Sequence, residues 1–185
     1  MAVADRKASV TMPRGTLIAV DGIDAAEVVA AARARIAAAA RPRRAGVSLW
    51  DASGVFDDLV VAGPDAGIPS ARTLLLLYAA DLAFRLRWEI KPAVIEGRVI
   101  AAAPYVATAV AFGRAAGLPT AWLKELFRFA PRPAQACYVD CSSARSGFIG
   151  FGCNQLSRHA NGFSARDTVA RARTHLQAAA RRTRF

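Results

Sequence analysis

Short apolar runs alternate with longer helix-forming segments along the chain. Residues 16–20 (TLIAV) are an apolar, partly β-branched run that ends in a turn at Asp21 and Gly22, and residues 25–40 follow with strong helix formers. Residues 46–50 (GVSLW) repeat the strand pattern after the basic stretch RPRR at 41–44, which Pro42 interrupts. These segments predict a strand, a helix and a second strand.

The alternation continues through the rest of the chain. Ser70 is placed to cap an apolar helix over residues 71–90, which Pro92 should end. We expect a strand at 98–102, helices at 105–116 and 121–129, a strand at 136–140 and an Ala-rich helix at 164–182. This order predicts an α/β fold with a mostly parallel sheet covered by helices on both faces, and ligands at the carboxyl ends of the strands.

Composition indicates one domain. The chain has 185 residues, of which 54% are hydrophobic and 21% charged, enough apolar material for one buried core. We assign residues 1–15 to an N-terminal extension and 16–185 to the domain. The longest apolar run, residues 73–84, contains Asp81 and is too short to span a bilayer, and the N-terminus lacks the apolar centre of a signal peptide. We therefore expect a cytoplasmic protein without a membrane partner.

The formal net charge of +11 favours anionic ligands. It does not by itself indicate a nucleic acid partner, and we do not expect one. The simpler interpretation is an Arg-rich, solvated surface.

Cysteine and histidine give little evidence of a reactive site. Cys137, Cys141 and Cys153 are odd in number and lack paired CxxC spacing, so no metal site is expected. Cys141 and His159 could form a nucleophile and base pair, but a free cysteine is more often a small buried hydrophobe.

Four stretches carry a resemblance to a known family. They are LIAVDGIDAAEVV (17–29), LLLLYAADLAFRL (74–86), IKPAVIEGRVIAAAPYVATAVAFG (90–113) and ACYVDCSSAR (136–145). Their order and spacing resemble thymidylate kinase, which transfers the γ-phosphoryl group of ATP to dTMP, and the block 74–113 is the most specific part. The resemblance implies a three-layer, P-loop NTPase-like fold. The chain ends where the family adds a final strand and helix, so we expect one strand of the sheet to be missing.

The predicted phosphate-binding loop departs from its motif. A working loop needs G-x-x-x-x-G-K-[ST], in which backbone N–H groups close on the phosphates, Lys reaches the β and γ phosphates and the hydroxyl holds magnesium. Gly22 matches the first glycine, but Glu27 replaces the second, Val28 the lysine and Val29 the hydroxyl residue. Glu27 would repel a triphosphate, so we do not expect tight ATP binding.

Three other charged positions of the family are also replaced. The Asp-Arg-Tyr step after the third strand reads Ala103-Pro104-Tyr105, the arginine after Ala-Asp is Leu82, and the arginine after the second strand is Trp50, followed by Asp51. Phosphoryl transfer depends on positioning and electrostatic stabilisation, and loss of one preorganised donor typically costs about 10²- to 10³-fold in rate. These replacements predict a protein without ordinary kinase chemistry.

The resemblance also implies a pocket for the base and sugar of the acceptor. Tyr78 lies where a family aromatic stacks on thymine, Phe112 where a second ring closes the pocket, and Asp24 where a carboxylate meets the sugar 3'-hydroxyl. A glutamine that helps to read thymine is Gly113 here, which leaves base specificity open. An equally weighted alternative is that both rings are core aromatics. The candidate ligand-binding residues are Asp24, Trp50, Asp51, Tyr78, Leu82, Tyr105, Thr108 and Phe112.

The family's lid should lie between residues 140 and 164. Arg145 and Arg158 lie in this segment, and either could bind an anion, although an exposed loop arginine is more often simply solvated.

Three functions are compatible with this pattern. The first is a degenerate thymidylate kinase-like protein that needs no cofactor and binds a nucleotide, a nucleoside, another planar small molecule or a protein partner through the former nucleotide cleft. The second is a different enzyme whose less charged cleft accepts a hydrophobic substrate, with Asp24, Glu27, Asp51 and Tyr105 as candidate catalytic groups. The third is a dTMP kinase with an atypical loop, which would use ATP and magnesium. Family members commonly dimerise through helices beside the sheet, so we also expect a homodimer.

Overall fold

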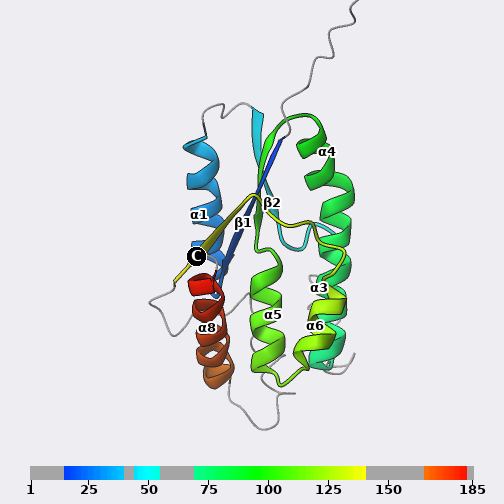
Figure 1. The fold of residues 1–185 in the computed structure, drawn as a ribbon, viewed down its shortest axis with the longest axis vertical. Coiled ribbons are helices and arrows are strands. Elements are labelled where there is room, and N and C mark those ends of the chain that lie inside the picture. The colour runs from blue at the N-terminus through cyan, green and yellow to red at the C-terminus, as the bar shows by residue number, and fades with distance from the viewer. Residues whose placement is uncertain (1–14, 40–43, 55–68, 141–164, 183–185) are drawn as a thin grey trace, which may run out of the picture.

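Four parallel strands form the sheet of this protein, for which the computed structural model describes residues 15–39, 44–54, 69–140 and 165–182. The strand order is β2-β3-β1-β4, with β4 at one edge (Figure 1). The strands are β1 (Thr16–Gly22), β2 (Ala45–Leu49), β3 (Val99–Ala103) and β4 (Gln135–Val139). The N-terminal extension up to residue 14 and the predicted lid, with Arg145, Arg158 and the Cys141 and His159 pair, lie outside the described residues.

Helices connect the strands and cover both faces of the sheet, which confirms the predicted α/β fold. They are α1 (Ala25–Ala37), α3 (Ala71–Arg85), the π-helical turn η3 (Leu86–Ile90), α4 (Lys91–Ile95), α5 (Val106–Ala115), α6 (Thr120–Leu126) and α8 (Ala165–Arg182). No helix in the described part of the chain is long and apolar enough to cross a membrane.

Side chains of the strands alternate between two apolar cores. Ile18 and Val20 of β1 face α1 and pack with Val28 and Ala32. Leu17 and its neighbours on the opposite face pack into a larger core shared by α3, α5, α6 and α8. The sheet is therefore buried on both sides, as a parallel sheet requires.

Pro92 does not end the long helix, contrary to the sequence prediction. The helix passes through the π-helical turn η3, in which the N–H of Lys91 bonds to the carbonyl of Leu86, five residues earlier. Pro92 then lies in the first turn of α4, where a missing N–H is tolerated, and the helix continues to Ile95. The π-helical turn thus lets a helix that would break at Pro92 continue along the domain.

Candidate functional site

The turn between β1 and α1 occupies the position of the predicted phosphate-binding loop. Helix α1 begins at Ala25, directly after Asp24. The carboxylate of Asp24 accepts a hydrogen bond from the N–H of Glu27 at 2.9 Å, and its carbonyl accepts one from the N–H of Val28 at 2.9 Å. Two donors at the start of α1 are therefore satisfied by Asp24 itself, as in an ordinary N-cap.

Val28 closes this turn with apolar contacts. Its side chain is 1% exposed and packs in the core beneath α1. A Cβ atom added to Gly22 would lie 2.6 Å from Cγ2 of Val28, so the two residues are in close contact. The position that carries the phosphate-binding lysine in a working loop therefore holds a buried methyl group, beside the half-buried Val29.

Asp21, at the carboxyl end of β1, ties α5 to the sheet. Its Oδ1 atom accepts hydrogen bonds from the N–H of Tyr105 at 2.9 Å, the N–H of Thr108 at 3.0 Å and the hydroxyl of Thr108 at 2.8 Å. Burial raises the pKa of the Asp21 carboxyl, and the bonds from Thr108 and Tyr105 oppose that shift. The structure thus uses Thr108, a predicted ligand contact, to anchor the start of α5. Asp21 is not among the site residues predicted from the sequence, although an acid at the end of a predicted strand is a signal that could have identified it.

Aromatic side chains fill the predicted acceptor cleft. The ring of Tyr78 stacks on Trp50, with ring centroids 5.5 Å apart and an interplanar angle of 24°, and meets Phe127 edge-on at 6.0 Å. The hydroxyl of Tyr78 donates a 2.6 Å hydrogen bond to the carbonyl of Tyr105, and burial raises its pKa well above the ordinary value. The ring predicted to stack on thymine therefore stacks on Trp50, which replaces a family arginine.

The base-reading side of the cleft is packed as well. Leu82 and Phe112 are buried in the large core. A Cβ atom on Gly113 would lie 2.6 Å from Cδ2 of Leu123 and 2.9 Å from Cδ1 of Leu75. A larger side chain at residue 113 would therefore require the side chains of Leu123 and Leu75 to shift, and glycine permits the close packing seen here.

Each catalytic candidate follows the carboxyl end of a strand and has a contact or position of its own. Asp24 caps α1 beside the half-buried Glu27. Asp51 follows β2 with a left-handed backbone (φ 59°), and its N–H bonds to the carboxylate of Asp81 at 3.2 Å. The hydroxyl of Tyr105 donates to the carbonyl of Pro131 at 2.6 Å, and burial raises its pKa. Among the described residues, no cluster of three or more His, Cys, Asp or Glu side chains is arranged to hold a metal ion.

Comparison with known proteins supports the resemblance. Three curated proteins called probable thymidylate kinase align over 65 residues, or 35% of this chain: those of Pyrococcus abyssi (38% identical), Pyrococcus horikoshii (40%) and Thermococcus gammatolerans (40%). The crystal structure of thymidylate kinase from Ehrlichia chaffeensis superposes with a TM-score of 0.70, covering 92% of this chain and 83% of that one at 12% identity. The chain is related to the thymidylate kinases.

The sequence similarity covers a minor part of the chain, whereas the similarity in fold covers nearly all of it. The aligned stretch spans about a third of the length of the curated thymidylate kinases (32%, 32% and 31%). No protein-family model matches the chain. The superposition confirms the P-loop kinase fold over nearly the whole chain.

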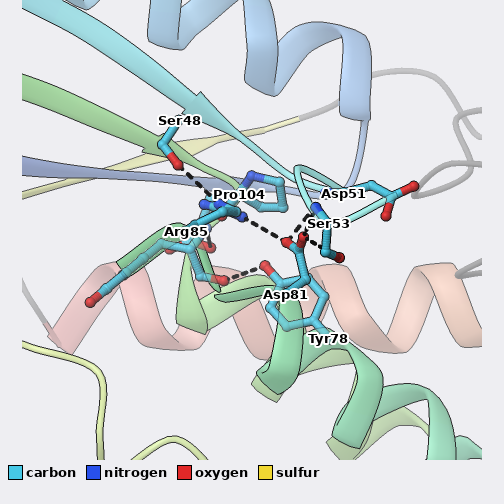
Figure 2. A network of polar contacts seen from close by, with 9 residues as sticks. Ser48, Asp51, Ser53, Tyr78, Asp81, Arg85 and Pro104 are labelled. Atoms are coloured by element: carbon cyan, nitrogen blue, oxygen red, sulfur yellow. Dashed lines mark hydrogen bonds and ion pairs between the residues drawn. The ribbon is translucent and has the colours of Figure 1, made fainter. Parts of the chain in front are cut away.

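A buried ionic network surrounds Arg85 of α3 (Figure 2). The guanidinium of Arg85 in α3 donates from Nε to Ser48 Oγ at 3.0 Å and from Nη2 to the carbonyl of Pro104 at 2.8 Å. Its Nη1 pairs with Asp81 at 3.6 Å, and the two side chains are 0% and 1% exposed. Asp81 also accepts hydrogen bonds from the N–H and hydroxyl of Ser53. The network joins α3 to the ends of β2 and β3.

Asp81 and Arg85 were not predicted from the sequence to form a pair, although a signal for it is present there. The two charges are four residues apart in a helix that is otherwise strongly apolar, so both lie on one face. Such a pair is usually solvated. Here its face is covered by the sheet, which makes the pair structural.

We predict that Asp81→Ala destabilises the protein by about 3–5 kcal/mol, because it leaves the buried guanidinium of Arg85 without its counter-charge. The matched control is Glu125→Ala, which removes an exposed partner of Arg128 at 3.1 Å and should change stability by less than about 1 kcal/mol. Urea unfolding of both variants measures the difference. Equal free energies of unfolding for the two variants would show that the buried pair stabilises the protein no more than the exposed pair does.

Proposed function

We propose that this chain is a thymidylate kinase-like protein that does not carry out ordinary ATP-dependent phosphoryl transfer and acts by binding. The main support is the turn between β1 and α1, where Val28 packs against Gly22 and Asp24 caps the helix. A phosphate-binding loop works because free backbone N–H groups and a lysine face the anion. Neither the N–H of Glu27 nor the side chain of Val28 is available for that task.

The surroundings of the turn favour the same proposal. Apolar or uncharged residues stand at three positions where the thymidylate kinase pattern has charges: Trp50, Leu82 and the Ala103-Pro104 step. The nearby cation, Arg85, is bonded to protein atoms. A transferring phosphoryl group would therefore meet little electrostatic stabilisation.

The ligand of such a binding protein is a nucleotide, a nucleoside, another planar molecule or a protein. A planar ligand in the former acceptor cleft would have to displace Trp50 before it could stack on Tyr78. We therefore expect such a ligand to bind weakly there. The alternative of a new enzyme with a hydrophobic substrate gains no support from a cleft filled by Tyr78, Leu82 and Phe112. The dTMP kinase alternative is favoured by the 38–40% identity to probable thymidylate kinases, so it is the one to test.

We predict no dTMP-dependent formation of ADP from magnesium-ATP above the rate without protein, and no rise in the melting temperature at millimolar magnesium-ATP, since a ligand that binds only the native state must stabilise it. The thymidylate kinase of Ehrlichia chaffeensis serves as the positive control in both assays. Turnover that disappears in Asp24→Ala would establish the kinase and overturn the proposal.

We further propose a homodimer formed through the long helix of residues 71–95. Five large apolar side chains on this helix and beside it are between 40 and 79% exposed. Leu76, Phe84 and Trp88 follow one another at spacings of eight and four residues, so they form one stripe along the helix. An exposed apolar stripe of this kind typically marks an interface. The five exposed side chains are Leu76, Phe84, Trp88, Ile95 and Phe129.

The expected mass in analytical ultracentrifugation is about twice the 19.6 kDa of one chain. Phe84→Glu with Trp88→Glu should yield the monomer, because two charges would be buried in the apolar contact. Ala170→Glu, on the exposed face of α8, is the control and should stay dimeric. A monomeric wild-type protein would refute the dimer.

A further inference from the structure

A cavity of about 310 Å³ opens between α5, α8 and the segment that leads from α6 into β4. Phe112 and Gly113 of α5, which pack in and beside the larger core, are not among its lining residues. Its volume is at the lower end of the range of about 300–1,000 Å³ that small-molecule pockets occupy. Val106 of α5 lines it together with four α5 residues that repeat at helical spacing: Ala107, Val110, Ala111 and Arg114.

The inner wall of the cavity is apolar and aromatic. Tyr105 and Phe127 are buried there, and the half-buried Tyr138 of β4 stands beside them. The hydroxyl of Tyr105 is already bonded to the carbonyl of Pro131, so this residue offers the cavity mainly its ring. Aromatic walls of this kind suit a flat aromatic ligand.

Charges in the lining are separated by depth. Arg114 and Arg132 are exposed and His175 is half-buried, which places these basic groups toward the mouth. Asp21, the acid in the lining, is 2% exposed and lies at the inner end with its Oδ1 bonded to Tyr105 and Thr108. A ligand with one negative group would be attracted to the mouth, because the basic groups of the lining lie there.

The surroundings of His175 show that the mouth has an excess of positive charge. Burial lowers the pKa of the His175 imidazole, and Arg114 of α5 and Arg171 of α8 lower it further. Arg132 lines the same cavity. An anion bound at the mouth would offset these cations.

We propose that this cavity binds a small aromatic carboxylate, with its ring against Tyr105, Phe127 and Tyr138 and its carboxylate at Arg114, Arg132 and His175. The cavity shares Tyr105 with the candidate residues of the former acceptor cleft, but Tyr78, Leu82 and Phe112 of that cleft are not among its lining residues. The proposal does not depend on whether the kinase assay is negative, because none of the β1–α1 turn residues 22–29 line this cavity.

The test is calorimetric titration of the full chain with naphthalene-2-carboxylate and with its neutral analogue naphthalene-2-carboxamide. We expect the carboxylate to saturate one site per chain and to bind at least about tenfold more tightly than the amide, because bonds to a charged group are stronger. Arg114→Gln with Arg132→Gln should weaken the carboxylate about tenfold. In NMR titrations the pKa of His175 should rise when the carboxylate is bound.

The matched control is Arg87→Gln with Arg128→Gln, which removes the same charge from two exposed positions outside the cavity and should leave affinity unchanged. Absence of binding at millimolar carboxylate, equal affinity for carboxylate and amide, or equal loss in the two double variants would each overturn the proposal. All these results are independent of dTMP phosphorylation, so failure here and failure of the proposed function can be told apart.

Discussion

The guanidinium of Arg85 is a positive charge without exposed surface, and the carboxyl ends of β2 and β3 are arranged around it. Arg85 needs partners because an unpaired buried charge is very costly. Ser48 at the end of β2, the carbonyl of Pro104 after β3 and the carboxylate of Asp81 supply them. Asp81 in turn accepts the backbone N–H of Asp51, which fixes the chain directly after Trp50. The buried ion pair thus helps to position the indole that stacks on Tyr78.

The carboxyl edge of the sheet is packed at two places where the thymidylate kinase pattern has charged residues. At the end of β2, Trp50 stacks on Tyr78, and the neighbouring cation Arg85 is bonded to protein atoms. At the β1–α1 turn, the side chain of Val28 is buried and contacts Gly22.

Local patterns were enough to predict the sheet and most helices, because short apolar runs such as residues 16–20 and capped segments such as that after Ser70 have local causes. The effect of Pro92 was mispredicted because a proline normally ends a helix, whereas the π-helical turn before it places Pro92 in the first turn of α4. The stack of Trp50 on Tyr78 joins residues 28 positions apart from two elements, and no periodicity signals it. The cavity beside His175 likewise arises only when α5 and α8 pack together. The departures from the phosphate-binding motif at Glu27, Val28 and Val29 were visible in the sequence. The contacts that these residues make instead were not.

The proposal that this protein lacks kinase chemistry depends most directly on the closed turn between β1 and α1. The decisive measurement is a two-dimensional amide NMR titration of the protein with magnesium-ATP, following Gly22, Glu27 and Val28. We predict that these amide resonances stay unchanged at millimolar nucleotide, because the N–H groups of Glu27 and Val28 are bonded to Asp24 and that of Gly22 to the hydroxyl of Thr108. Saturable shifts of the three amides would mean that the turn opens to hold phosphate, and would contradict the account.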